Sequence, residues 1–200
     1  MTDAGPTEDL SRGWEASANE FIAVADPHIG AETVARWSSF LQSGNALLDV
    51  GCGFGGTYTR GLIDKGVDVY GIDAAPTLLR EYQERFPEVT VCCEAAEQSP
   101  FFHRTFDAVV CIGLVFLLPA EDQELVLRKM AKAVKIDGRL LFTSPRQVCD
   151  WDDLLTGRRS VSLGRAAYVH ILQEQGLHLV SEYSNEGQNH YYNFQKGEVP

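Results

Sequence analysis

Four glycines stand where the chain is expected to turn from a buried strand into a helix. Gly51, Gly53, Gly55 and Gly56 follow the apolar run 46–50 and precede a segment with helical periodicity. Glycine lets the backbone turn tightly and approach a ligand without an intervening Cβ atom, and the first turn of a helix offers free N–H groups. The pattern is typical of a loop that binds a small polar ligand.

Acidic residues accompany the ends of three predicted strands. Asp49 precedes the glycines, Asp73 ends the second strand, and Glu94 follows the third. Because ligands bind at the carboxyl ends of parallel strands, we expect the three acids to share one site. A carboxylate accepts hydrogen bonds from sugar hydroxyls and pairs with cationic groups. The alternatives are that Asp49 caps the turn, Asp73 caps the next helix and Glu94 is a solvated loop acid.

The glycine spacing also permits another class of enzyme. Gly51-x-Gly53-x-x-Gly56 matches the fingerprint of dinucleotide-binding proteins, and Asp73 stands near the position of their ribose-binding acid. A nicotinamide-dependent oxidoreductase is therefore one candidate. Asp49 argues against it, because a second negative charge opposes a pyrophosphate and suits an ammonium or sulfonium group. A non-catalytic module with the same fold is a third candidate, which the intact acids oppose.

Strand-like and helical segments alternate along the chain. Short apolar runs bounded by turn residues predict buried strands over 46–50, 67–73, 89–93, 106–112 and 139–143. Apolar residues at helical spacing predict helices over 14–22, 34–41 and 75–86, after Pro119, and after Ser162, which would cap the last of them. Two more strands, 177–183 and 190–194, are separated by hairpin spacing. We therefore predict an α/β fold with a seven-stranded, mostly parallel sheet, an antiparallel C-terminal hairpin and helices on both faces.

Several segments resemble one family. LLDVGCGFGG (47–56) resembles motif I of the class I S-adenosylmethionine-dependent methyltransferases, and GIDA (71–74) resembles the acidic end of their second strand. CEAAE (93–97) resembles the segment after their third strand, and FDAVV (106–110) and GRLLF (138–142) resemble strands four and five. The resemblance covers about residues 14–196. It implies a Rossmann-like methyltransferase fold, an enzymatic activity and S-adenosyl-L-methionine as the cofactor.

The resemblance assigns the cofactor site residue by residue. It implies that Gly51, Gly53 and Gly55 form the floor under the methionine part, with Asp49 near its amino group. Asp73 would hold the ribose, because a carboxylate accepts from both vicinal hydroxyls.

The resemblance also assigns the adenine end of the site. Ala74 would follow the ribose-binding acid, and Glu94 with the backbone of Ala95 would bind the adenine edge. The family more often has Asp at this point, so Glu97 is the alternative to Glu94. Cys111, at the end of the fourth strand, would line the cofactor.

Further candidates lie in the segments expected to cover the strand ends, which are the first helix, the loop after the fourth strand and the segment 144–161. Trp14 on the first helix is a candidate for the cofactor site. Arg146 could bind a carboxylate and Trp151 could form a wall for an apolar or cationic acceptor, with surface charge and lid packing as alternatives. His190 or Tyr191 could act as a base or orienting group, with core or edge packing as the alternative. Methyl transfer is an in-line displacement that depends on alignment, so a dedicated base is optional.

Length and charge limit the architecture and the partners. The 200 residues fit one domain, which we divide into an N-terminal helical lid (1–44), a cofactor-binding core (45–144) and a substrate-side loop, helix and closing hairpin (145–200). The net charge of −11 disfavours nucleic acid. Arg158, Arg159 and Arg165 are expected to be solvated. A small-molecule acceptor is therefore expected, with methylation of a protein or RNA as the alternative.

The remaining features concern location. The five cysteines are odd in number and form no C-x-x-C, which indicates thiols and not disulfides. The polar N-terminus lacks the apolar run of a signal peptide, and the apolar stretch 108–118 is too short to cross a bilayer. We expect a cytoplasmic protein with no membrane partner and no metal.

Overall fold

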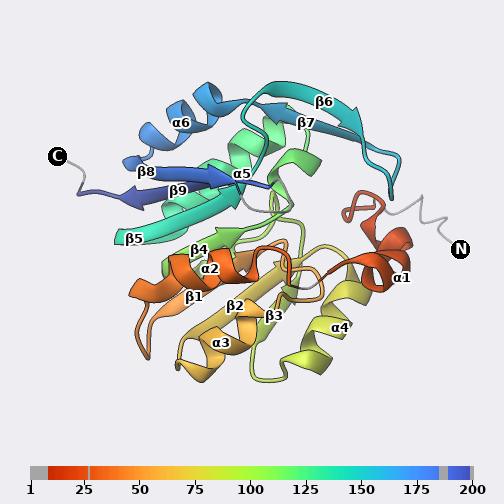
Figure 1. Cartoon of the computed structure of the whole chain (residues 1–200), viewed down its shortest axis with the longest axis horizontal. Coiled ribbons are helices and arrows are strands. Elements are labelled where there is room, and N and C mark those ends of the chain that lie inside the picture. Colours follow the sequence, from red (N-terminus) through yellow and green to blue (C-terminus); the bar gives the residue numbers. More distant parts are fainter. Residues whose placement is uncertain (1–8, 27, 185–188, 199–200) are drawn as a thin grey trace, which may run out of the picture.

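A seven-stranded sheet forms the centre of the computed structural model, which describes residues 9–26, 28–184 and 189–198 (Figure 1). The strands lie in the order β3-β2-β1-β4-β5-β9-β8. Their bounds are β1 Ala46–Val50, β2 Asp68–Asp73, β3 Thr90–Cys93, β4 Phe106–Cys111, β5 Val134–Thr143, β8 Leu177–Ser184 and β9 His190–Lys196. The pairings from β3 to β5 are parallel, and β9 is antiparallel to both β5 and β8. The predicted fold class is confirmed.

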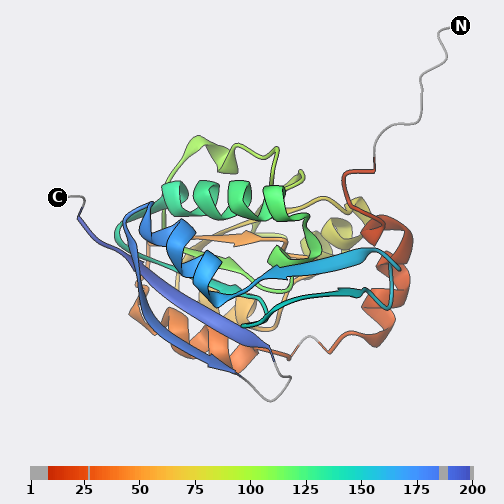
Figure 2. The same ribbon diagram turned by 90° about the horizontal axis from the view of Figure 1, so that it is seen from above.

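Helices cover both faces of this sheet (Figure 2). One face carries α2 (Ala31–Trp37), α3 (Tyr58–Asp64) and α4 (Pro76–Arg85), and the other carries α5 (Ala120–Ala133) and α6 (Arg165–Gln173). Successive side chains of a strand point to opposite faces, so Leu48 and Val50 of β1 enter the core under α5, whereas Leu47 enters the core under α2 to α4. Because both faces are covered, polar groups with a ligand-binding role are left to the strand ends.

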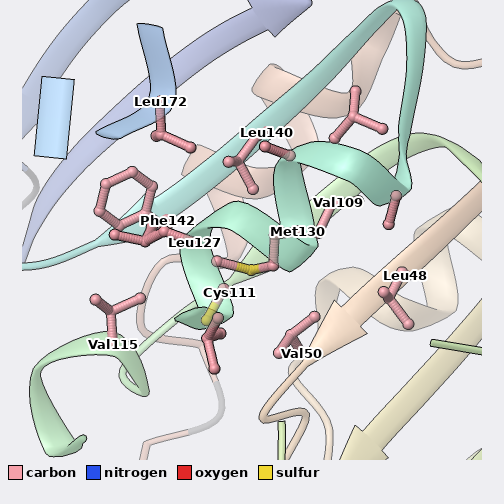
Figure 3. Close-up of a cluster of buried hydrophobic side chains, with 14 of the residues drawn as sticks. Leu48, Val50, Val109, Cys111, Val115, Leu127, Met130, Leu140, Phe142 and Leu172 are labelled. Atoms are coloured by element: carbon pink, nitrogen blue, oxygen red, sulfur yellow. The ribbon is translucent and has the colours of Figure 1, made fainter. Parts of the chain in front are cut away.

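The core under α5 fixes the end of β4. Leu127 and Met130 of α5 pack in one cluster with Cys111, Val115 and Phe142, and all five side chains are fully buried (Figure 3). Val115 begins the short 3-10 helix η3 (Val115–Leu117), which follows β4. The turn that leaves the fourth strand is therefore attached to the core at both of its ends.

The strand predicted over 139–143 begins earlier, at Val134. Its pairing with β4 shifts register between Phe106 and Ala108, opposite a bulge in which Asp137 adopts a positive φ of 62°. The turn expected at Asp137-Gly138 is thus a bulge inside a longer strand, because the strand resumes its pairing with β4 after the extra residues.

The segment after β5 forms a second, two-stranded sheet that the sequence did not predict. β6 (Val148–Asp152) and β7 (Arg159–Leu163) pair antiparallel. Together with the turn over 153–158 they form what we call the arm, which extends toward α1 in both views (Figures 1 and 2). Ser162 lies inside β7, where its Oγ donates to the Pro145 carbonyl at 2.9 Å. The predicted cap was therefore wrong, and Gly164 precedes α6.

The two parts of the predicted N-terminal lid lie in different places in the fold. Residues 9–13, which we call the strap, and α1 (Trp14–Val24) lie beside the arm, where the Ser17 hydroxyl donates to the Leu155 carbonyl at 3.1 Å. The α2 helix instead belongs to the core layer, because the Trp37 indole N–H donates to the Asn193 side chain at 2.8 Å in a buried contact. Residues 1–8 of the lid and 185–188 of the hairpin turn lie outside the described residues. Within the described ranges, every helix is too short or too polar to cross a bilayer.

Leu127→Ala is predicted to destabilise the protein, because it leaves a cavity in the fully buried cluster under α5. The expected loss in the free energy of unfolding is about 2 to 5 kcal/mol, measured by urea denaturation. The matched control is Leu125→Ala on the same helix, where the side chain is 45% exposed and the expected change is small. Equal losses in both variants would contradict this description of the core.

Candidate functional site

A cavity of about 320 Å³ opens at the carboxyl ends of β1, β2, β3 and β4. The predicted site residues that line it are Trp14, Gly51, Gly53, Asp73, Ala74, Glu94, Ala95 and Glu97. They come from three strand ends and from α1, so the sheet brings together residues that are up to 83 positions apart (14 to 97). The volume lies in the range of small-molecule pockets.

Asp73 connects two of the strand ends. Its carboxylate accepts a hydrogen bond from the backbone N–H of Gly53 and another from that of Ala75, each at 2.9 Å. Burial raises the pKa of Asp73, and these backbone donors oppose the rise. Asp73 makes no cap of α4, whose N-cap residue is Ala75. The carboxylate thus holds the glycine loop against the end of β2.

Backbone hydrogen bonds attach the loops after β1 and β3 to the end of β2. The N–H groups of Gly51 and Cys52 both donate to the Ile72 carbonyl, at 2.9 and 3.0 Å. The Glu94 N–H donates to the carbonyl of Asp73 at 3.0 Å. The loops after β1 and β3 are therefore both attached to the end of β2, the strand between them.

The glycine positions have different physical causes. A Cβ atom at Gly51 would lie 2.9 Å from the Cβ of Leu114, so the turn after β4 can pack closely only against glycine. A Cβ at Gly55 would lie 2.6 Å from the Phe86 ring, which makes this glycine a packing residue outside the cavity lining. Gly53 has a positive φ of 54° and open space toward the cavity, with its nearest neighbour at 4.0 Å. Backbone conformation and close approach to a ligand both favour glycine there.

Asp49 lies behind the glycine loop and does not line the cavity. It is 1% exposed and accepts a hydrogen bond from the Tyr58 hydroxyl at 2.7 Å. Burial raises the pKa of Asp49 to about 7, and the nearby Asp73 charge adds to the rise, while the Tyr58 hydrogen bond opposes it. The predicted contact of Asp49 with a cofactor amino group remains a prediction.

Two glutamates line the cavity after β3. Hydrogen bonds from Ser99 and Cys92 lower the pKa of Glu94, which therefore stays ionised. Glu97 accepts from the Arg12 guanidinium at 3.3 Å. Ala95, which is 3% exposed, lies between them in sequence. Which glutamate binds an adenine edge stays a prediction.

Aromatic side chains of α1 cover the glycine loop. The Trp14 and Phe21 rings meet edge to face at 5.2 Å, and Phe21 contacts Phe54 in the same way at 5.4 Å. Glu15 fixes α1 to the start of α4, because its carboxylate accepts from the backbone N–H of Thr77 at 2.9 Å and from its hydroxyl at 2.6 Å. The apolar cover is thus attached to the body of the domain.

The sequence prediction named only some of the lining residues, although it expected the first helix, the loop after the fourth strand and the segment 144–161 to contribute. The other lining residues belong to segments around the strand ends. The strap gives Leu10, Ser11 and Arg12, and α1, β2, α4 and the loop after β3 give Phe21, Ile72, Leu78 and Ala96. The turn after β4 and the arm give Ile112, Gly113, Leu114, Phe116, Leu117, Leu118 and Asp153. The apolar run over 112–118 was a signal for the turn after β4. The strap residues gave no such signal, because their place depends on contacts with distant segments.

Besides Asp49 and Gly55, three further predicted binding residues lie away from the cavity lining. Cys111 is 0% exposed and packs in the core under α5 with Leu127 and Met130, as Figure 3 shows, and it does not line the cavity. Arg146 pairs with Glu182 at 3.0 Å. Trp151 packs against Phe116 with ring centroids 5.5 Å apart, and so supports a lining residue from behind.

Neither candidate base lines the cavity. His190 is 9% exposed, its Nδ1 is 3.1 Å from the Ser184 hydroxyl, and burial lowers its pKa. Tyr191 is fully buried in the core under α2 to α4, and burial raises its pKa to about 12. A base role for either residue remains a prediction that this geometry does not favour.

Comparison with known proteins identifies a family that this chain matches. Over residues 47–138 the chain matches a family described as a methyltransferase domain. That range contains the glycine loop, Asp73 and both cavity glutamates. This match supports the predicted class I S-adenosylmethionine-dependent methyltransferase family. The cofactor of this family is S-adenosyl-L-methionine, so the predicted family and cofactor are both confirmed.

Individual relatives of this methyltransferase are distant. O-methyltransferase resE of Aspergillus sclerotiorum is 28% identical over 134 residues, which are 64% of this chain and 49% of that protein. Demethylmenaquinone methyltransferase of Beutenbergia cavernae is 27% identical over 150 residues, or 71% and 58% of the two chains. The methyltransferase thus spans about half the length of these curated relatives. N-methyltransferase NodS of Bradyrhizobium japonicum, solved with S-adenosyl-L-homocysteine, shares the fold with a TM-score of 0.70 at 17% identity, covering 93% of this chain and 100% of that one.

The cavity of this methyltransferase fits the cofactor. A carboxylate has about four acceptor sites, so Asp73 retains capacity for ribose hydroxyls beyond its backbone donors. Gly53 leaves open the space that a Cβ would fill. Apolar and aromatic side chains form much of the remaining wall. In the described part of the chain, no group of three or more metal-binding side chains is gathered.

Asp49→Asn is predicted to stabilise the methyltransferase increasingly as pH rises. The pKa of Asp49 is about 7 in the folded protein and near 3.8 in the unfolded chain, so the folded state binds the proton more strongly. The wild type therefore loses stability as the pH rises from about 4 to about 7. Asparagine avoids this loss and can still accept from Tyr58. We expect a gain of about 2 to 4 kcal/mol at pH 8 that shrinks toward pH 4, measured by denaturation at several pH values.

Asp68→Asn is the control for this pH series, because Asp68 is an exposed aspartate at the start of β2. Its stability difference from the wild type should not show the same dependence on pH. A difference for Asp49→Asn that stayed constant from pH 4 to pH 8 would contradict the assigned burial of the charge.

Proposed function

We propose that this chain transfers the methyl group of S-adenosyl-L-methionine to a small-molecule acceptor. The observation that carries the proposal is the partial cover of the cavity, since the strap, α1 and the arm of the same chain lie over the strand ends around a space of about 320 Å³. Such a cover admits a small molecule more readily than a folded macromolecule. The net charge of −11 also opposes a nucleic acid substrate.

The chain's own residues would act chiefly by binding and positioning. When bound, S-adenosyl-L-methionine supplies a methyl group activated by its sulfonium. Gly51 and Gly53 would let the backbone approach the cofactor, and Asp73 would fix the sugar. Trp14 and the turn after β4 would exclude water and hold the acceptor in line, which lowers the barrier of a displacement reaction. We assign no general base.

The proposed location is the cytoplasm. All five cysteines lie in the described ranges and are free thiols, which supports a reducing compartment. A small-molecule substrate in that compartment is the partner we propose, and the oligomeric state is left open.

A calorimetric titration tests the cofactor class directly. Dialysed protein is titrated with S-adenosylhomocysteine and, under identical conditions, with NADH. We expect binding of S-adenosylhomocysteine in the micromolar range or tighter and none of NADH. Binding of NADH alone would indicate an oxidoreductase instead. Binding of neither ligand would favour a non-catalytic module. Screening of small thiols, amines and phenols by S-adenosylhomocysteine release then identifies the acceptor.

Asp73→Ala is predicted to weaken S-adenosylhomocysteine binding by about 100-fold or more, because it removes both the ribose acceptor and the anchor of the Gly53 loop. The same calorimetric titration measures the loss. Asp68→Ala on the same strand is the matched control, since its exposed side chain has no place in the cavity. Gly53→Val, at a positive φ, should also abolish binding. Unchanged affinity in both site variants would refute the assigned site.

A further inference from the structure

A second cavity lies beside the cofactor cavity, between the strap, the turn after β4 and the arm. Its volume is about 260 Å³. Arg12, Trp14 and Leu117 line both cavities. The two cavities are therefore adjacent, with these three side chains on their common border.

The charge of this second cavity is opposite to that of the whole chain. Its lining contains the guanidinium groups of Arg12, Arg158 and Arg159 and no carboxylate, although the chain carries a net charge of −11. Thr156 and Ser160 add hydroxyl groups. Guanidinium and hydroxyl donors together are typical of sites that bind carboxylate, sulfate or phosphate groups. These arginine and hydroxyl groups therefore favour the binding of an anionic ligand in this cavity.

Two of the arginines are already neutralised by acids outside the lining. Arg12 pairs with Asp122 at 2.5 Å and with Glu97 at 3.3 Å. Arg159 pairs across the arm with Asp150 and Asp152. Each of these arginines has two carboxylate partners, so neither has a strong electrostatic reason to bind another anion.

Arg158 differs from its neighbours. Its sole ion pair within the described residues is with Asp9 at 3.4 Å, and both side chains are about half exposed, at 55% and 47%. Ion pairs between exposed side chains contribute little to stability, so an incoming anion can replace Asp9 at little cost. Arg158 retains N–H donors that this single contact does not use.

Arg158 lies next to the strap and follows an ordered turn of the arm. Its Nε lies 3.2 Å from the place that a Cβ atom of Gly13 would take, so the side chain rests on the strap next to Trp14. On the arm, the Asp153 carboxylate accepts from the backbone N–H groups of Leu155 and Thr156, at 3.1 and 2.8 Å, which fixes the turn. Arg158 therefore lies at the junction of the strap and the arm, on an ordered turn.

We propose that this cavity binds an anionic group of the methyl acceptor and that Arg158 is its main contact. The inference rests on the proposed function and narrows the acceptor to molecules that carry a carboxylate, sulfate or phosphate besides the atom that is methylated. Trp14, Leu117 and Pro119 supply an apolar wall for the carbon skeleton between the two groups.

Benzoate and benzamide are the probes, because they share size and shape and differ in charge. Each is titrated into isotope-labelled full-length protein, with and without S-adenosylhomocysteine, at constant ionic strength, and backbone amide shifts are followed by NMR. We expect benzoate to shift the amides of Thr156, Arg158 and Ser160 and to bind about tenfold more tightly than benzamide. Arg158→Gln should remove this preference.

Arg128→Gln is the matched control, because Arg128 lies on α5 away from both cavities and pairs with Glu124 and Glu174. Its preference for benzoate should equal that of the wild type. Equal affinities for the two probes, no binding of benzoate, or an equal loss in both variants would overturn the inference. Calorimetric binding of S-adenosylhomocysteine to the same samples separates the two proposals, since its failure in the wild type would contradict the methyltransferase function instead.

Discussion

The hydrogen bonds between the Asp73 carboxylate and the backbone of Gly53 and Ala75 determine the geometry of the site. They join the loop after β1 to the end of β2, and the carbonyls of Ile72 and Asp73 extend the same connection to the loops after β1 and β3. Because the sheet is buried on both faces, these strand ends are where polar groups can meet a ligand without disturbing the core. The cofactor cavity follows from this constraint.

Segments outside the parallel sheet complete the cavity. Arg12 attaches the strap to α5, Glu15 attaches α1 to α4, and Ser17 joins α1 to the arm. These contacts connect the first described residues with α5, α4 and the segment after β5. The family fold thus provides the cofactor site, while the strap and the arm shape the space next to it. We infer that acceptor specificity lies in these two additions.

The sequence predicted the part of this structure that depends on local patterns. The seven strands, the glycine loop and the meeting of Gly53 with Asp73 follow from strand-helix alternation, since parallel strands end at one edge. The arm was missed because β6 and β7 are short and the buried residues of β7, Ser160 and Ser162, are polar, so no apolar alternation marks the strand. Arg12 was missed because its partners Glu97 and Asp122 are 85 and 110 positions away. Cys111 was assigned to the cavity because it stands at the end of the fourth strand. The sequence did not show that its side chain packs in the core under α5.

Hydrogen exchange with and without S-adenosylhomocysteine tests most directly the claim that the strand ends and their cover form one cofactor site. The account predicts slower exchange of backbone N–H groups in the loops over 51–56 and 94–97, after Asp73, and in the strap. The β8 edge and α6, which line neither cavity, should keep their rates. Unchanged exchange in these loops under saturating ligand, or protection confined to β8 and α6, would contradict it.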